Sequence, residues 1–96
     1  MSKDAKEAAD TWNTMIFDKK TGQIKTNAKE VIQEAIKTPE GWEQMKFVTK
    51  NANLTTNARK TIIEALQANG QWEKLTPAEK QLVIGNNVAL FKLYSS

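Results

Sequence analysis

The sequence predicts a small all-α domain built from two tandem helical repeats of about 30 residues, with partial copies at both ends. Three tryptophans, Trp12, Trp42 and Trp72, stand 30 residues apart with no insertion between them. The sequence of residues 25–36 is largely repeated at residues 55–66. In the first copy the apolar residues recur at i, i+3, i+4, i+7 and i+8, the spacing of an amphipathic helix, and the second copy repeats this spacing except at i+3, where Thr61 stands.

The agreement between the copies covers most of the unit. A third, weaker copy begins at Trp72, and the segment before Trp12 corresponds to the tail of a missing copy. No proline- or serine-rich linker divides the chain, so we expect residues 1–96 to form a single all-helical repeat domain. The matched positions include Trp12/Trp42, Met15/Met45, Phe17/Phe47, Lys20/Lys50, Ile24/Leu54, Thr26/Thr56, Asn27/Asn57, Ala28/Ala58, Ile32/Ile62, Glu34/Glu64, Ala35/Ala65 and Ile36/Leu66.

Helix starts are marked by residues whose side-chain oxygen can accept from the first free backbone N–H groups. In the third copy Thr76-Pro77-Ala78-Glu79 combines a Thr cap, proline at the first helical position and Glu three residues after the cap. The predicted caps are Thr26, Asn27, Thr56, Asn57 and Thr76. The expected helices are about 3–16, 28–37, 38–50 (helical at least through Phe47), 58–69, 77–84 and 88–94.

Turns are expected where glycine follows a helix. Gly41 and Gly70 lie just beyond the two repeat helices, where a left-handed residue can close them. The segment 18–22 indicates a turn and not a helix. The last helix departs from the pattern, because Lys92 stands in the place of a core isoleucine, and we expect Phe91 and Leu93 to supply its buried face instead.

The apolar positions of the repeat predict the core. The tryptophans could instead be stacking platforms for bases or sugars. Their regular spacing, each followed by Met or Leu, favours packing between adjacent units. The predicted structural core is Trp12, Trp42, Trp72, Met15, Met45, Leu75, Ala28, Ile32, Ala35, Ala58, Ile62, Ala65 and Leu66.

Composition excludes several classes of function. The 96 residues contain no cysteine and no histidine, which removes thiolate chemistry, the usual catalytic triads and the commonest zinc ligands. We therefore expect no enzymatic activity, no cofactor, no metal and no small-molecule substrate. No apolar run approaches the ~20 residues of a membrane span, and residues 1–4 lack the apolar stretch of a signal peptide.

Two recurring charged positions are candidates for function. Glu34 and Glu64 recur in register, but neither has a histidine or second carboxylate beside it, so a helix-surface role is favoured. Lys20, Lys50 and Lys80 could form a ladder that meets an anionic partner, or could pair with nearby glutamates, which is favoured. The net charge of +3 is scattered. A small helical nucleic-acid-binding module is therefore kept as the alternative function, although a nucleic-acid partner is disfavoured.

The unit Trp-x-x-Met/Leu-x-x-x-x-Lys, then Thr-Asn-Ala, then Ile-x-Glu-Ala resembles repeats in tail tape measure proteins of long-tailed phages and prophages of Gram-positive bacteria. The residues that carry the resemblance are Trp42, Met45, Lys50, Thr56-Asn57-Ala58, Ile62 and Glu64-Ala65, with their partners one period earlier. Tape measure proteins are much longer than this chain.

The resemblance implies a non-catalytic structural role. In that family the protein lies within the tail during virion assembly, its length sets tail length, and it leaves ahead of the DNA on infection. The implied partners are other phage tail proteins or further copies of the repeat. The implied location is the virion tail, or the host cytoplasm during assembly.

Overall fold

The computed structural model describes the backbone of residues 3–94 and the side chains of residues 6–94. In this range the chain is all-helical, and its strand-like pairing is limited to an isolated antiparallel bridge between Phe17 and Ile24. The predicted all-α class is confirmed. The elements are α1 (Lys3–Ile16), α2 (Ala28–Lys37), α3 (Pro39–Asn51), α4 (Thr56–Ala68), the 3-10 turn η1 (Trp72–Lys74), α5 (Pro77–Ile84) and α6 (Val88–Tyr94).

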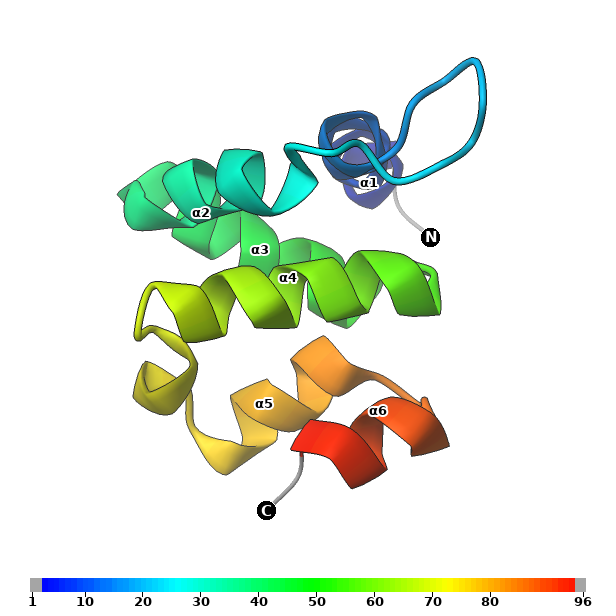
Figure 1. The fold of residues 1–96 in the computed structure, drawn as a ribbon. Coiled ribbons are helices and arrows are strands. Elements are labelled where there is room, and N and C mark those ends of the chain that lie inside the picture. The colour runs from blue at the N-terminus through cyan, green and yellow to red at the C-terminus, as the bar shows by residue number, and fades with distance from the viewer. Residues whose placement is uncertain (1–2, 95–96) are drawn as a thin grey trace.

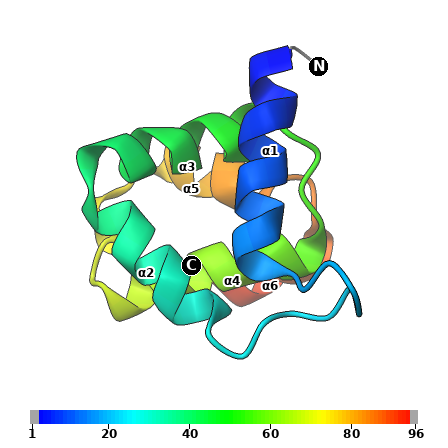
Figure 2. The same cartoon turned by 90° about the horizontal axis from the view of Figure 1, so that it is seen from above.

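The helices are stacked in layers. In Figure 1, α2, α4 and α6 follow one another from the top to the bottom of the molecule. The view from above in Figure 2 shows α3 and α5 behind them and α1 crossing at one side. The most extensive contact is between α2 and α4, the two helices that carry the repeated segment. The repeat helices therefore do pack side by side.

The core is centred on α4. Between Ala58 and Leu66 this helix contributes several fully buried side chains, among them Ile62, Ile63 and Leu66. Thr61 and Thr49 are also buried, and each hydroxyl donates to the carbonyl oxygen four residues earlier, so neither polar group is left unpaired. The buried apolar residues are Ala9, Trp12, Ile16, Ala28, Ile32, Ile36, Met45, Val48, Ala52, Leu54, Ala58, Ile62, Ile63, Ala65, Leu66, Trp72, Leu75, Val83, Ile84 and Leu90.

Most of the predicted core lies in this cluster, but Met15, Ala35 and Trp42 are only partly buried at its edge. Trp42 follows Gly41, which lies inside the first turn of α3 and faces α2. A Cβ on Gly41 would collide with the Ala35 carbonyl, so this contact requires glycine. The prediction that Gly41 closes α2 is therefore wrong. Gly70, with φ +69°, does follow α4 as predicted.

The three tryptophan segments differ in local structure. Trp12 lies in the third turn of α1, Trp42 in the first turn of α3 and Trp72 in a 3-10 turn. The cause is the position of the Thr-Pro helix start. Thr38-Pro39 precedes its tryptophan, whereas Thr76-Pro77 follows Trp72, so one indole is carried on the helix and the other ahead of it. The repeat architecture is thus not confirmed, although its two helical segments are.

The caps also depart from the prediction. Thr55, and not Thr56 or Asn57, caps α4: its extended backbone lets its hydroxyl accept from the Ala58 N–H, and α4 begins two residues earlier than expected. Asn27 occupies the N-cap position of α2 without a side-chain bond, because its ψ of 14° is not extended. Thr26 makes no capping bond to the helix either.

Thr76 is confirmed as a cap. Its hydroxyl accepts from the Glu79 N–H at 3.1 Å, and the Glu79 carboxylate accepts from the Thr76 N–H at 2.9 Å, forming a reciprocal capping box. Asn87 similarly caps α6, because its Oδ1 accepts from the Leu90 N–H at 2.9 Å.

The expectation that Phe91 and Leu93 form the buried face of α6 is wrong. Leu90 and, in part, Tyr94 face the core, since these positions lie one helical turn apart on the same side. The Tyr94 ring meets Trp72 edge-on, with centroids 6.4 Å apart. Phe91 and Leu93 lie on the two flanks of that contact and are exposed.

The central position of α4 gives a direct stability test. Ile62→Ala should lower the free energy of unfolding by about 2–5 kcal/mol, because Ile62 is fully buried and the neighbouring layers cannot collapse freely into the cavity. Chemical denaturation monitored by circular dichroism measures the change. Ile24→Ala, the same substitution at a 43 % exposed position, is the matched control and should cost much less. Equal losses for both would contradict the assigned core.

Candidate interaction surface

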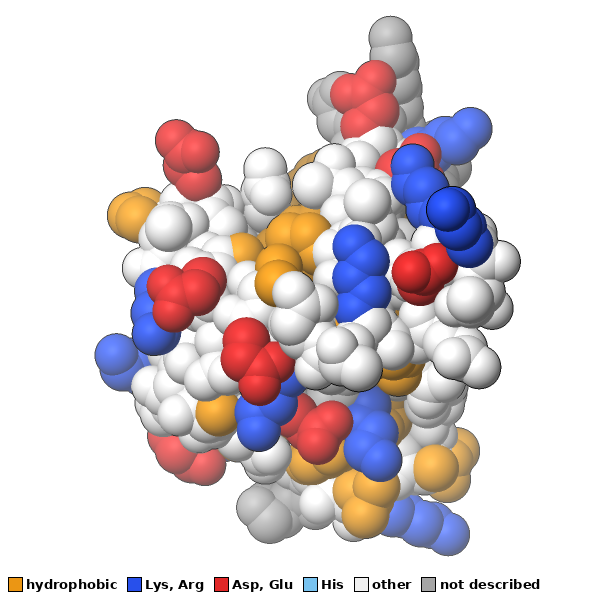
Figure 3. Space-filling model, turned by 45° about the horizontal axis from the view of Figure 1, so that its top comes forward, with side chains coloured by type: hydrophobic (Ala, Val, Ile, Leu, Met, Phe, Trp, Pro, Cys, Tyr) orange, Lys and Arg blue, Asp and Glu red, His pale blue; other side chains and the backbone are white. Residues whose placement is uncertain are grey.

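Exposed large hydrophobic side chains gather on α5 and α6. Leu82, Val88, Phe91 and Leu93 have exposed fractions of 40, 68, 46 and 67 %. We call these four residues the α5–α6 surface. Figure 3 shows hydrophobic side chains together at the lower edge of the molecule, where these helices lie. Apolar side chains gathered in this way, rather than scattered singly, typically mark a contact site.

A shallow groove runs beside this surface. One part, of about 410 Å³, lies between the end of α3, the start of α4 and the α5–α6 corner, and includes Leu82. A second part, of about 220 Å³, lies against Val88 and Phe91. The two parts share Gln81, Gly85 and Asn86 in their lining, so they lie next to each other. Its lining contains Lys50 and Arg59 but no carboxylate.

Arg59 holds the floor of this groove in place. Its guanidinium donates to the carbonyl oxygens of Leu82 at 2.9 Å and Val83 at 3.0 Å, at the end of α5. It also donates to the carbonyl oxygens of Thr49 and Ala52, at the end of α3. One side chain therefore satisfies free carbonyls of two helix ends. Burial lowers the pKa of the Arg59 guanidinium from its ordinary value, although it stays charged.

Gly85 makes room for this arginine. It ends α5 with φ +72°, a conformation that favours glycine, and a Cβ placed there would lie 2.8 Å from Arg59 Cζ. The chain then turns directly into α6. The Asn87 Nδ2 donates to the Thr56 hydroxyl at 2.7 Å, which links the start of α6 to the start of α4. The α5–α6 surface is thus fixed to the core at both its corner and its far end, where Tyr94 meets Trp72.

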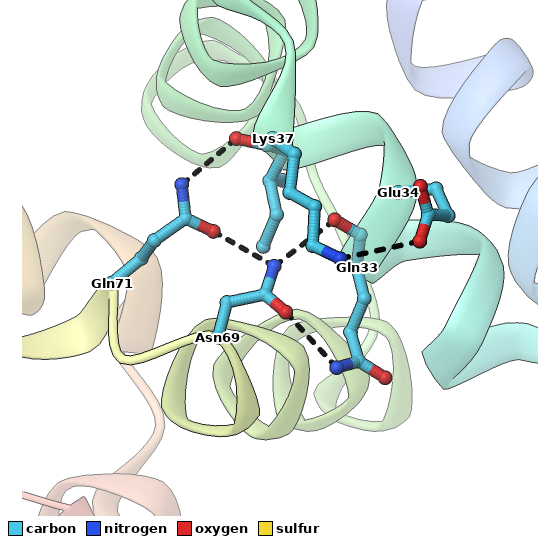
Figure 4. A network of polar contacts seen from close by, with 6 residues as sticks. Gln33, Glu34, Lys37, Asn69 and Gln71 are labelled. Atoms are coloured by element: carbon cyan, nitrogen blue, oxygen red, sulfur yellow. Dashed lines mark hydrogen bonds and ion pairs between the residues drawn. The ribbon is translucent and has the colours of Figure 1, made fainter.

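A second polar cluster joins α2 to the end of α4. Figure 4 shows Gln33 Nε2 donating to Asn69 Oδ1, and Asn69 Nδ2 donating back to the Gln33 carbonyl, both at 3.0 Å. Asn69 Nδ2 also donates to Gln71 Oε1, while Gln71 Nε2 donates to the Ile36 carbonyl at 2.9 Å. Each amide is occupied by a neighbour within the chain, so this network stabilises the α2–α4 contact.

An ion pair links α3 to α5. Lys46 Nζ lies 3.0 Å from Glu79 Oε2. The backbone N–H of Thr76 and the ammonium of Lys46 together hold the pKa of the Glu79 carboxyl below its usual range. The same carboxylate raises the pKa of Lys46. This ion pair joins α3 to α5, so we assign it to the stability of the fold and not to a functional site.

The recurring charged positions do not assemble into a site. Glu34 is exposed and pairs with Lys37 at 3.3 Å, and Glu64 is exposed on another helix. Lys80 pairs with Glu73 at 3.6 Å and lies over the Trp72 ring. Lys20 lies in the turn after α1 and Lys50 at the end of α3, so the lysines occupy three different kinds of element. Within residues 6–94 no cluster of acidic side chains could hold a metal ion.

Comparison of the chain with models of known protein families, with curated proteins and with solved structures finds no match. Across residues 3–94, every helix is too short or too polar to cross a bilayer. The apolar α5–α6 surface, with the groove beside it, is the candidate interaction site of the described residues.

The sequence carried a signal for this surface. Six of the seven residues in α6 are apolar. A helix of two turns that lies against one layer can bury only one side, so most of these side chains had to remain exposed.

Arg59→Lys tests how the groove is held. A lysine ammonium has one nitrogen and cannot reach four carbonyl oxygens at two helix ends, so we expect a loss of about 1–3 kcal/mol in the free energy of unfolding. Denaturant titration measures it. Lys60→Arg, on the next residue of α4, is the exposed control and should have little effect. A wild-type stability for Arg59→Lys would show that these bonds contribute nothing.

The Lys46–Glu79 pair predicts a pH dependence. Because the folded state lowers the pKa of Glu79, its contribution is complete above the ordinary carboxyl pKa of 4.5 and is lost as the pH falls through the folded value. Glu79→Gln should therefore be less stable than wild type at neutral pH, and the difference should shrink in acid. Denaturant titrations at pH 7 and about pH 3 test this. Glu7→Gln, the same substitution at an exposed position of α1, is the control for replacing a carboxylate by an amide. If the stability difference between wild type and Glu79→Gln is the same at both pH values, the assignment is wrong.

Proposed function

We propose that this chain is a non-catalytic structural and interaction domain of a phage tail tape measure protein. The observation that carries the interaction role is the α5–α6 surface, where Val88 and Leu93 are each exposed by about two thirds. The solvation of such apolar side chains is unfavourable, so covering them with a partner lowers the free energy. The tape measure assignment is supported by the motif resemblance around Trp42, Met45 and Thr56-Asn57-Ala58.

In this role the domain acts through shape and contact. Its described residues are held by apolar layers, helix caps and side-chain amides, none of which is a covalent or metal cross-link. A stack of short helices joined in this way can assemble with tail proteins in the host cytoplasm and remain in the virion tail. Its partners on this proposal are other tail proteins or further copies of the repeat.

Purified tails test the proposal. Tail particles from the bacterium that carries this gene should contain peptides of residues 1–96 by mass spectrometry, in a fixed ratio to the major tail protein. Deleting the coding sequence should shorten the tails or prevent their assembly, as seen by electron microscopy. Tails of unchanged length in the deletion strain would overturn the proposal.

A DNA titration separates this role from nucleic-acid binding. We expect no saturable binding of duplex DNA at physiological salt, because the net charge of +3 is scattered over the chain. Tight binding that weakens steeply with added salt would instead favour the nucleic-acid-binding alternative.

A further inference from the structure

Asparagine is followed by glycine at one place in the sequence, Asn69-Gly70. In such a step the backbone nitrogen of the glycine can attack the asparagine Cγ, because glycine has no side chain that shields its nitrogen. Asn69 is half-buried at the end of α4, whereas Gly70 is exposed and has open space where a Cβ would stand. Water therefore reaches this peptide bond.

We propose that Asn69 is a deamidation site, and that the folded chain keeps it protected. In this reaction the Gly70 nitrogen loses its proton and forms a bond to Asn69 Cγ, while the Cγ–Nδ2 bond breaks and ammonia leaves. Water then adds to either carbonyl of the cyclic imide and breaks the bond of that carbonyl to the Gly70 nitrogen. The product is aspartate or, where the backbone now runs through the side chain, isoaspartate. Water is the only co-reactant.

The attacking nitrogen is held away from the side chain. The Gly70 N–H donates to the Gln67 carbonyl oxygen at 3.0 Å, and the Gln71 N–H donates to the Leu66 carbonyl oxygen at 2.8 Å. These two bonds close the end of α4 in a Schellman motif. The ψ of Asn69 is −3°, which turns the Gly70 nitrogen towards the Asn69 backbone nitrogen and away from the Asn69 Cβ. Ring closure therefore requires the end of α4 to open.

The side chain of Asn69 is held through both ends of its amide. Its Nδ2 donates to the Gln33 carbonyl oxygen at 3.0 Å and to Gln71 Oε1 at 2.8 Å, so both amide protons are used. Its Oδ1 accepts from Gln33 Nε2 at 3.0 Å. Figure 4 shows the Asn69 amide between these two glutamines. The Cγ cannot turn towards Gly70 without breaking these bonds.

Deamidation makes the opening permanent. A carboxylate at position 69 has no N–H, so it cannot donate to the Gln33 carbonyl or to Gln71 Oε1. Gln71 cannot compensate by turning its amide, because its Nε2 donates to the Ile36 carbonyl oxygen at 2.9 Å. The new negative charge also lies at the C-terminal end of α4, where the helix dipole disfavours it. The modified chain therefore has a weaker contact between α2 and α4.

Mass spectrometry of the full chain, incubated in mildly alkaline buffer with and without denaturing urea, tests the proposal. Asn69 should deamidate at least about tenfold more slowly in the folded chain than in urea, because the reaction follows the population of the open form. Asn53, an exposed asparagine that precedes leucine, is the internal control and should react slowly in both. Equal rates at Asn69 with and without urea would overturn the proposal. So would an Asn69 that reacts no faster than Asn53 in urea.

Gln71→Ala tests whether the side-chain amides supply the protection. This variant lacks the acceptor of Asn69 Nδ2 and the bond to Ile36, so Asn69 should react several times faster in native buffer. Gln67→Ala, the same substitution at an exposed side chain of α4, is the matched control and should react as wild type. All three chains should react equally in urea, and circular dichroism confirms that the variants fold. A wild-type rate for Gln71→Ala would show that the amides do not protect Asn69.

Asn69→Asp reproduces the aspartate product. It should unfold at a lower urea concentration than wild type, because its carboxylate lies against the Gln33 carbonyl and Gln71 Oε1. Asn53→Asp, the same substitution in the connector before α4, should have little effect. A wild-type midpoint for Asn69→Asp would contradict the expected loss of the α2–α4 contact. None of these outcomes depends on the tape measure assignment, which the tail particles test separately.

Discussion

The burial of α4 between two layers is the constraint on which the rest of the structure depends. Ile62 and Ile63 are adjacent in the sequence and therefore point about 100° apart around the helix, yet both are fully buried. One neighbouring layer cannot cover so wide an apolar sector. The α2 helix covers one side of α4, and α5 with η1 covers another, while α1 makes a smaller contact with it. Each helix that packs on α4 also has a side that faces away from α4.

The helical segments could be predicted because their causes are local. The apolar spacing of 28–37 and of 58–66, and the Thr76-Pro77-Ala78-Glu79 start, depend on residues a few positions apart. The tryptophans could not be predicted in the same way. Their equal spacing indicated equal environments. However, Thr38-Pro39 starts a helix before Trp42, whereas Thr76-Pro77 starts one after Trp72. Trp42 therefore lies on a helix, and Trp72 lies ahead of one. The sequence repeat thus predicted the two repeat helices better than it predicted the segments that connect them.

The candidate surface was harder to read from the sequence because its supports are backbone groups. Arg59 corresponds to Lys29 and Ala89 in the register, so nothing in the repeat marks it as special. Its partners are carbonyl oxygens of Thr49, Ala52, Leu82 and Val83, which every residue possesses and no sequence pattern distinguishes. Only the fold, by bringing the ends of α3 and α5 to the same place, gives the arginine its role. Gly85 then becomes necessary as well.

A surface held in this way is suited to reversible contact. Arg59, Asn87 and the Trp72–Tyr94 contact fix α6 against the core, so little backbone freedom remains to be lost when a partner binds. Rigid apolar surfaces of this kind also carry a risk of uncontrolled association, because they are not specific by themselves. A lysine within the apolar helix reduces that risk, as charged residues do beside exposed apolar segments elsewhere. Lys92 is exposed where the preceding repeat helices have the buried isoleucines Ile32 and Ile62, so α6 differs from α2 and α4 in having solvent on one of its sides.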